Sequence, residues 1–171
     1  MDSMVSVRPC SSDDLARLLD SGPTFADRHH HTERFAMQDA GEAIYLVAWE
    51  CYQVRGRCTV LRESKYSDVR QTLGPFPEIN ALEARPTGHG VGTALLRASD
   101  DVARNLCATQ VGLAVEETNR GALRLYERLG YTRWEDRVII DRWRELREDG
   151  SEVEHADEAR YMIKALRSPV S

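Results

Sequence analysis

The sequence predicts an α/β protein, of the α+β kind, in which a mixed sheet is flanked by helices. Short apolar runs typical of strands recur along the chain. Two helical stretches follow the first of these runs, and two more separate the later ones, an order typical of a sheet covered by helices. A chain of 171 residues has the length of one domain, so residues 1–171 are interpreted as a single unit.

The first third of the chain predicts a strand, two helices and a hairpin. Val5 and Val7 alternate with polar neighbours, as in a strand. Ser11 begins a polar stretch suited to cap a helix whose leucines share one face. In order, the elements are a strand at 4–8, a helix after the capping residues 11–14, a helix at 26–39 that ends near Gly41, and paired strands at 43–49 and 57–61.

The rest of the chain predicts a loop followed by alternating strands and helices. The polar segment 63–76 includes the breakers Gly74 and Pro75, which are typical of a loop. The turn signal Glu148-Asp149-Gly150-Ser151 predicts a hairpin. In order, the elements are a strand at 78–84, a helix at 90–106, a strand at 108–115, a helix at 119–129 closed by Gly130, a strand-rich stretch from 131 and a closing strand at 160–166.

Composition narrows the function classes. No apolar run approaches the length that spans a bilayer, and the first ten residues lack the profile of a secretion signal, so we expect a cytoplasmic protein with no membrane partner. The four cysteines are scattered without a Cys-x-x-Cys pair, which predicts reduced thiols and no metal centre. The formal charge of −5 disfavours nucleic acid as a partner and suits a cationic substrate.

The most informative segment is the glycine-rich stretch Thr87-Gly88-His89-Gly90-Val91-Gly92, which joins a predicted strand to a predicted helix. Glycines remove the Cβ atoms that hold a ligand off the backbone, and amides at a helix N-terminus converge on an anion such as a pyrophosphate. An ordinary glycine-rich turn has the same pattern. The segment has no Gly-Lys-Ser/Thr and no G-x-G-x-x-G, which excludes a P-loop and the dinucleotide fingerprint.

With two flanking motifs, this loop resembles the GNAT acetyltransferase superfamily. The resemblance implies acetyl-CoA as the cofactor and a mostly antiparallel, splayed sheet of six to seven strands with about four helices. Thr87 departs from the pattern, because the family usually has Gln or Arg there. The flanking motifs are Leu82-Glu83-Ala84-Arg85-Pro86 before the loop and Asn119-Arg120-Gly121-Ala122-Leu123-Arg124-Leu125-Tyr126, followed by Gly130-Tyr131, after it.

The resemblance also implies where the cofactor binds. A β-bulge near Leu82 to Ala84 opens its strand, and the unpaired backbone groups bond the pantetheine arm as if it were another strand. Asn119 contacts the cofactor, caps the following helix, or does both. The implied cofactor-binding residues are Leu82, Ala84, Thr87, Gly88, His89, Gly90, Val91, Gly92, Thr93, Asn119, Ala122 and Tyr126.

An acetyl transfer to an amine needs a base and an acid, because an alkylamine is protonated near pH 7 and must lose a proton before it attacks a thioester. Glu78 stands at the general-base position of several family members, and a surface carboxylate at a strand start is the alternative. Glu116 and Glu117 are the reserve candidates. Tyr126 stands where the family places the tyrosine that protonates the CoA thiolate, and a core aromatic is the alternative.

The acceptor side is predicted from the second helix and the last hairpin. His29-His30-His31 cannot converge on one metal ion, because neighbouring residues on a helix project about 100° apart. The hairpin 134–158 covers the acceptor site, forms a homodimer contact, or is a solvated face. The candidate substrate-binding residues are His30, Glu33, Gln38, Glu78, Glu116 and Glu117.

We expect acetyl transfer to a primary amine of a small molecule. An aminoglycoside-type antibiotic is the preferred acceptor, because it is polycationic and the chain is acidic, and such an activity confers antibiotic resistance. Transfer to a protein N-terminus or lysine is the second possibility. A non-catalytic acyl-CoA sensor built on the same fold is a possibility of another class.

Overall fold

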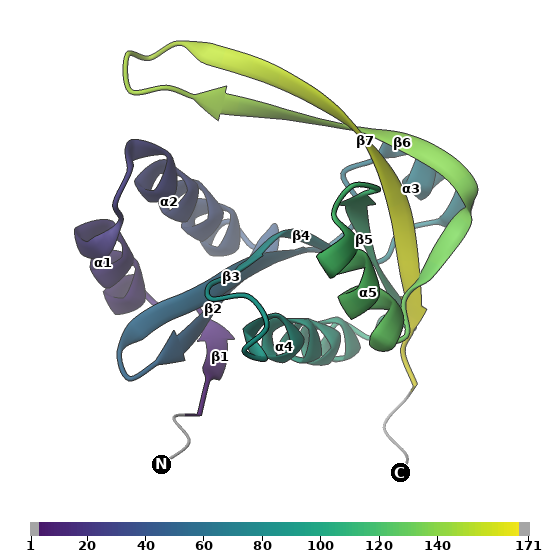
Figure 1. Ribbon diagram of the computed structural model, residues 1–171, viewed down its shortest axis with the longest axis horizontal. Coiled ribbons are helices and arrows are strands. Elements are labelled where there is room, and N and C mark those ends of the chain that lie inside the picture. The colour runs from purple at the N-terminus through teal and green to yellow at the C-terminus, as the bar shows by residue number, and fades with distance from the viewer. Residues whose placement is uncertain (1–3, 168–171) are drawn as a thin grey trace.

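A computed structural model describes residues 4–167 (Figure 1). Within that range seven strands form one sheet in the order β1-β2-β3-β4-β5-β7-β6, and only β4 and β5 are paired in parallel. The predicted mixed, mostly antiparallel sheet is therefore confirmed. The strands are β1 (Ser6–Pro9), β2 (Ala43–Glu50), β3 (Gln53–Leu61), β4 (Glu78–Ala84), β5 (Gln110–Glu116), β6 (Thr132–Leu146) and β7 (Glu152–Ala165).

Helices cover both faces of the sheet. In β2, Leu46 and Ala48 pack in the cluster with α4 and α5, whereas Tyr45 and Val47 pack in the cluster with α1. This alternation is the strand period of two, and it separates the helices into two layers (Figure 1). The helices are α1 (Ser12–Ser21), α2 (Phe25–Asp39), α3 (Ser67–Leu73), α4 (Val91–Asn105) and α5 (Arg120–Arg128).

The helix α3 corrects the prediction that 63–76 is only a loop. Tyr66 and Val69, three residues apart, are both buried against a cluster that contains Trp134 and Tyr161. Gly74 follows with φ 84, and its N–H bonds Arg70 O. The breakers predicted from the sequence therefore end the helix, and packing against distant aromatic residues supports its single buried face.

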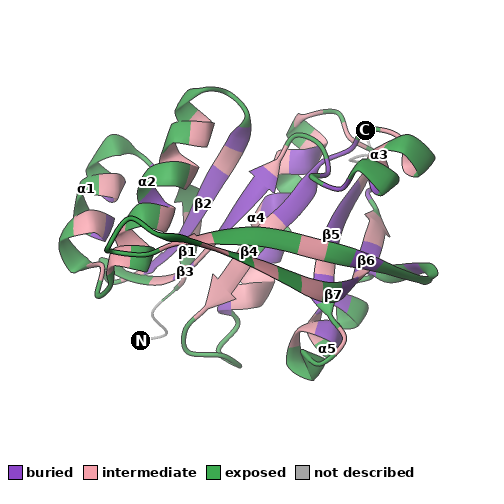
Figure 2. Ribbon diagram, turned by 90° about the horizontal axis from the view of Figure 1, so that it is seen from above, coloured by how far each residue is buried: buried purple, intermediate pink, exposed green. Residues whose placement is uncertain are grey.

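β6 and β7 form a long hairpin that reaches past the edge of the sheet toward α2 (Figure 1). Its turn lies where the sequence predicts it, and Asp149 Oδ1 accepts a 2.9 Å hydrogen bond from Ser151 N. β7 begins at Glu152, well before the predicted closing strand at 160–166. The outer half of the hairpin is largely exposed (Figure 2). No helix within residues 4–167 has the length and apolar character needed to cross a membrane.

Candidate active site

The sheet opens between β4 and β5. The two strands pair at only two positions, Glu78 with Gly112 and Ile79 with Leu113, and then diverge (Figure 1). Beyond Ile79, the backbone groups of β4 that face β5 have no strand partner within 4–167. Unpaired backbone N–H and C=O groups along a strand can form hydrogen bonds with an extended ligand, as they would with another strand.

A β-bulge in β4 lies beside this opening. The pairing of β3 with β4 shifts in register between Arg57 and Thr59, so that Ala81 and Leu82 both lie opposite Cys58. Ala81 has φ 52, in the left-handed region of backbone conformation that residues other than glycine rarely adopt. The bulge therefore lies within one residue of the predicted stretch, and it turns backbone groups away from the β3 ladder.

The glycine-rich loop presents bare backbone at the start of α4. Gly90 is the N-cap of α4 with φ 81, and no side chain caps this end of the helix. Gly88 has φ 78, and a Cβ built on either glycine would meet no atom within 4 Å. His89 is exposed and its Nδ1 lies 2.9 Å from Thr87 O, so its side chain contacts only its own loop. The first amides of α4 are thus open to an anion.

The third glycine of the loop has a packing role. A Cβ on Gly92 would lie 3.1 Å from Leu125 Cδ2, so the absence of a side chain lets α4 approach α5. Val91 is buried in the core, and Thr93 Oγ1 accepts a 3.2 Å hydrogen bond from Arg128. These contacts fix the N-terminal turn of α4 against α5.

A cavity of about 420 Å³ lies on the opposite, α2-bearing side of the bulge. Asn80 and Ala81 of β4 line it, and His30, Glu33 and Arg34 of α2 line the facing wall. The hairpin lines the remaining side with Trp143 and its neighbours, an arrangement compatible with the expected cover of an acceptor site, which stays a prediction. The cavity therefore brings His30 and Glu33 together with the bulge.

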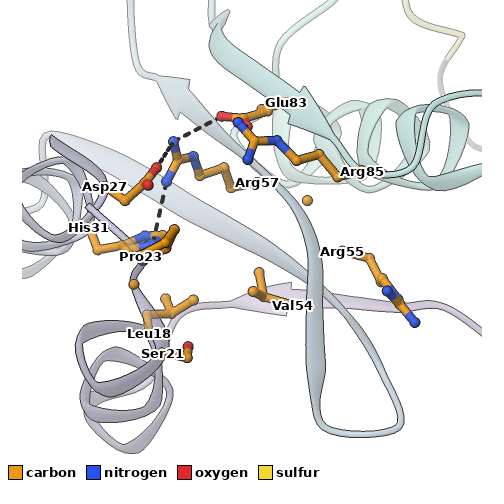
Figure 3. A pocket seen from close by; sticks show the side chains of 12 residues that line it. Leu18, Ser21, Pro23, Asp27, His31, Val54, Arg55, Arg57, Glu83 and Arg85 are labelled. Atoms are coloured by element: carbon orange, nitrogen blue, oxygen red, sulfur yellow. Dashed lines mark hydrogen bonds and ion pairs between the residues drawn. The ribbon is translucent and has the colours of Figure 1, made fainter. Parts of the chain in front are cut away.

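Arg57 separates this cavity from a smaller one of about 100 Å³ below α1. Its guanidinium lies 3.3 Å from Asp27 Oδ1 and 2.9 Å from Glu83 Oε2, and it contacts His31 Nε2 at 3.4 Å (Figure 3). Arg57 and Asp27 line both cavities. The ion pairs thus form a bridge from α2 to β4, and no local sequence pattern predicts this non-local contact.

Comparisons with known proteins identify the chain. Residues 14–131 match the acetyltransferase (GNAT) family. The chain belongs to the GNAT acetyltransferase family. A mycothiol acetyltransferase from Thermobispora bispora is 41% identical over 71 residues, which cover 40% of this chain and 24% of that protein. The N-alpha-acetyltransferase 30 of Schizosaccharomyces pombe is 36% identical over 63 residues, which cover 37% of this chain and 42% of that protein.

Solved GNAT structures share the fold over nearly the whole chain. The putative acetyltransferase yncA of Salmonella typhimurium, determined with acetyl-CoA, has a TM-score of 0.62 at 19% identity, with 98% of this chain and 96% of that chain covered. The ribosomal-protein-S18-alanine N-acetyltransferase of Escherichia coli has a TM-score of 0.60 at 17% identity, with 98% and 97% covered. The predicted GNAT fold is confirmed, with five helices within 4–167 against the four or so expected.

The tyrosine of the GNAT motif, Tyr126, lies on α5 and is only 6% exposed. Burial raises its pKa to about 12, and the nearby Cys58 thiol contributes in the same direction. Cys58 lies in β3 opposite the bulge, and it belongs to the same core cluster as Tyr126. Asn119 caps α5, since its Oδ1 accepts a 3.2 Å hydrogen bond from Ala122 N, and its exposure leaves it available for a second contact.

Glu78 lies at the start of β4 and is 1% exposed, which excludes the alternative of a surface carboxylate. Burial raises its pKa, opposed by hydrogen bonds from Ser64 and Tyr161. Lys65 N lies 3.4 Å from Glu78 Oε1, and the Lys65 side chain lines the larger cavity and pairs with Asp141. The carboxyl group of Glu78 is therefore beneath the cavity wall and does not line the cavity.

The other carboxylate candidates lie at the end of β5. Glu116 is exposed, and Glu117 Oε2 accepts a 2.6 Å hydrogen bond from Arg160 Nε. Arg160 lowers the pKa of Glu117, which makes it a weaker base. Neither residue lines the larger cavity.

Gln38 lies outside both cavities and links two elements instead. Its amide donates a 2.7 Å hydrogen bond to Cys10 O and accepts a 2.9 Å bond from Tyr45 N. Sequence reasoning missed Arg34, which shares a helix face with His30 at a spacing of four residues. That spacing was the available signal.

Proposed function

We propose that the chain is an acetyl-CoA-dependent N-acetyltransferase that acts on a primary amine of a small molecule. The supporting observation is the opening between β4 and β5. On one side it adjoins the bare amides of Gly88 and Gly90, and on the other it adjoins the cavity at Ala81. Two reactants can thus approach the same bulge from opposite faces of the sheet, as a direct transfer in a ternary complex requires.

The cofactor site fits this chain. A pyrophosphate would be held by main-chain amides from Thr87 to Thr93, with the unpaired backbone of Leu82 and Ala84 along the pantetheine arm. Asn119, Ala122 and Tyr126 of α5 would border that arm. When bound, acetyl-CoA supplies an acetyl group activated as a thioester. Thr87 lacks the long donor that the family usually has, so the main-chain amides carry the phosphate contacts here.

Glu78 is the proposed general base. Its raised pKa makes it a stronger proton acceptor than an exposed glutamate. Because its carboxyl group lies below Lys65 and outside the cavity, the proton of the amine reaches it through water. Glu116, Glu117 and bulk water are the alternatives.

Tyr126 is the proposed general acid. A pKa of about 12 keeps its phenol protonated at neutral pH, so it has a proton to give to the departing thiolate. Its ring packs in the core cluster with Val91 and Leu95 of α4, the helix that follows the glycine-rich loop, which supports this role.

Two acceptor classes remain as proposals. An aminoglycoside-type amine follows from the net charge of −5. A protein N-terminus is the second candidate, supported by the name of the Schizosaccharomyces pombe relative. His30 and Glu33, with the hairpin residue Trp143, would border either acceptor.

The test is a two-stage measurement on the purified chain. Calorimetry with acetyl-CoA should show saturable binding, and CoA release should follow on addition of some member of a panel of aminoglycosides, polyamines, amino acids and peptides. Binding without turnover on any amine would favour the non-catalytic acyl-CoA sensor. Absence of binding would contradict both functions.

A further inference from the structure

The wall of the larger cavity contains a half-buried arginine that makes no salt bridge within residues 4–167. Arg34 of α2 lines the cavity, and within residues 4–167 no hydrogen bond or ion pair satisfies it. Its Nε is buried, as is the Nε2 of His30 one turn earlier on the same helix face, and neither atom has a hydrogen-bond partner. Unpaired polar atoms in a cavity wall are costly for the protein alone and are relieved by a complementary ligand.

The other charges around the cavity are already neutralised. Arg57 pairs with Asp27 and Glu83, and Lys65 pairs with Asp141. Further along the hairpin, Arg144 pairs with Glu152 and Glu154, and His155 bonds Glu145. Among the charged cavity residues, Glu33 and Arg34 make no salt bridge, although Glu33 attracts the neighbouring Arg34 cation, and Glu145 bonds only a histidine. Glu33 is exposed and hydrated, whereas Arg34 is half-buried and its Nε is shielded from water, so Arg34 gains more from a ligand.

Burial and two nearby arginines determine the charge state of His30. Burial lowers the pKa of His30 to about 3, and Arg57 and Arg34 lower it further, against a smaller opposite effect of Asp27. The imidazole is therefore neutral and adds no compensating charge. The guanidinium of Arg34, next to this neutral imidazole and without a salt bridge, is the group on this wall that suits an anion.

We propose that the acceptor carries a carboxylate as well as its reacting amine, and that Arg34 binds this carboxylate. The inference rests on the proposed acetyltransferase function and narrows its acceptor to amino acids and short peptides. A planar guanidinium matches a carboxylate in a two-bond geometry, and neutral His30 beside it donates or accepts a further bond. The polycation expected from the net charge offers no partner to Arg34.

The experiment uses matched pairs of acceptors that differ in one group. Each amino acid of a panel is compared with its own carboxamide, which keeps the amine and side chain and removes the negative charge. CoA release gives kcat/KM for each partner. We expect the wild-type protein to favour the acid by roughly tenfold or more, the range of one charge-assisted contact. Equal use of acid and amide, or preference for the amide, would overturn the proposal.

Variants of Arg34 link the preference to this side chain. Arg34→Gln should reduce the acid-to-amide ratio to about one, and Arg34→Lys should restore part of it because the charge returns without the planar fork. Arg97→Gln removes an exposed arginine of α4 outside the cavity and should leave the ratio unchanged. An Arg34→Gln protein that keeps the wild-type ratio would exclude Arg34 as the anchor.

A binding measurement separates this inference from the proposed function. Calorimetry of the acid and of the amide, each added to protein saturated with CoA, reports acceptor affinity without turnover, and acetyl-CoA binding reports folding of each variant. If the protein acetylates other amines but no carboxylate-bearing amine, the inference is wrong and the proposed function still stands. If no amine supports CoA release and none binds, both fall together.

Discussion

Tyr161 donates a 2.9 Å hydrogen bond to Glu78 Oε2 across 83 residues of sequence. Both side chains are buried, and the bond joins β7 to the start of β4, where β4 and β5 are still paired. It therefore positions the proposed base at the point from which the two strands diverge.

Burial of Glu78 should make its effect on stability depend on pH. The pKa of Glu78 is raised in the folded state. Its contribution to the free energy of unfolding is therefore fully present below the unfolded-state pKa near 4.5, and it is lost as pH rises through the folded-state pKa. Glu78→Gln removes the ionisation that destabilises the protein at higher pH, and the glutamine side-chain oxygen can still accept the hydrogen bond from the Tyr161 hydroxyl. The difference in melting temperature between variant and wild type should therefore shift in favour of the variant as pH rises. Glu63→Gln, at an exposed position, serves as control, and a pH-independent difference would contradict the account.

The same substitution should alter catalysis. Without the carboxylate at Glu78, kcat/KM should fall by about 100-fold, the typical contribution of a positioned base, and the ionisation of the wild-type base should vanish from the pH-rate profile. CoA release measured from pH 5 to 9 gives the profile. A profile identical to wild type would assign the base to Glu116, Glu117 or water.

Tyr126→Phe should reduce kcat by roughly 100-fold and leave acetyl-CoA affinity nearly unchanged, because only the proton donor is lost. Calorimetry and steady-state kinetics on the same preparation separate the two effects. Tyr52→Phe, at an exposed position in the turn between β2 and β3, should match wild type in both. Unaltered turnover of Tyr126→Phe would remove Tyr126 from the role of acid.

The role of the loop amides in phosphate binding can be tested at two glycines that have similar φ angles. Gly90 and Gly41 have φ 81 and 74, and a Cβ on either meets no atom within 4 Å. Alanine at either position should destabilise the fold by about 1–2 kcal/mol through strain. Only Gly90→Ala should weaken acetyl-CoA binding, by roughly tenfold, because its methyl group projects where the phosphates would lie. Equal affinities of the two variants in calorimetry would argue against the loop as the phosphate site.

Gly112 supports the link between Tyr161 and Glu78. A Cβ on Gly112 would lie 2.3 Å from the Tyr161 hydroxyl oxygen, so Gly112→Ala must displace that ring. We expect a loss of about 3 kcal/mol in the free energy of unfolding, measured with denaturant. Gly121→Ala in α5 has open space around it and should stabilise the protein by about 0.5–1 kcal/mol. Tolerance of alanine at position 112 would show that the ring is not held as described.

Local patterns predicted most of the fold. The apolar run of β2, the caps at Ser11 and Asn119 and the turn at Asp149 all act within a few residues, and each is found where it was expected. The helix α3 was missed because its stability comes from packing of Tyr66 and Val69 against aromatic residues far along the chain. The local sequence of a polar segment flanked by helix breakers does not predict a contact with residues so distant along the chain.

The candidate site was predictable in part, for the same reason. The glycine loop is a short local pattern, and the bulge and Tyr126 were expected from the resemblance of two flanking motifs to the GNAT family. Arg57 and its two carboxylates, in contrast, meet only in the folded chain, and they divide the cavities (Figure 3). Gln38 was expected at the acceptor, yet its side chain is used to join α2 to the backbone of Cys10 and Tyr45. The direction in which a helical side chain points within its polar face is set by its neighbours in space.

A crystal structure with acetyl-CoA tests the central claim most directly. The account predicts the pyrophosphate on the amides of Gly88 and Gly90, the pantetheine arm between β4 and β5, and the thioester sulfur within hydrogen-bond reach of the Tyr126 hydroxyl. A cofactor bound elsewhere, or an opening between the strands that stays free of it at saturating concentration, would contradict the account.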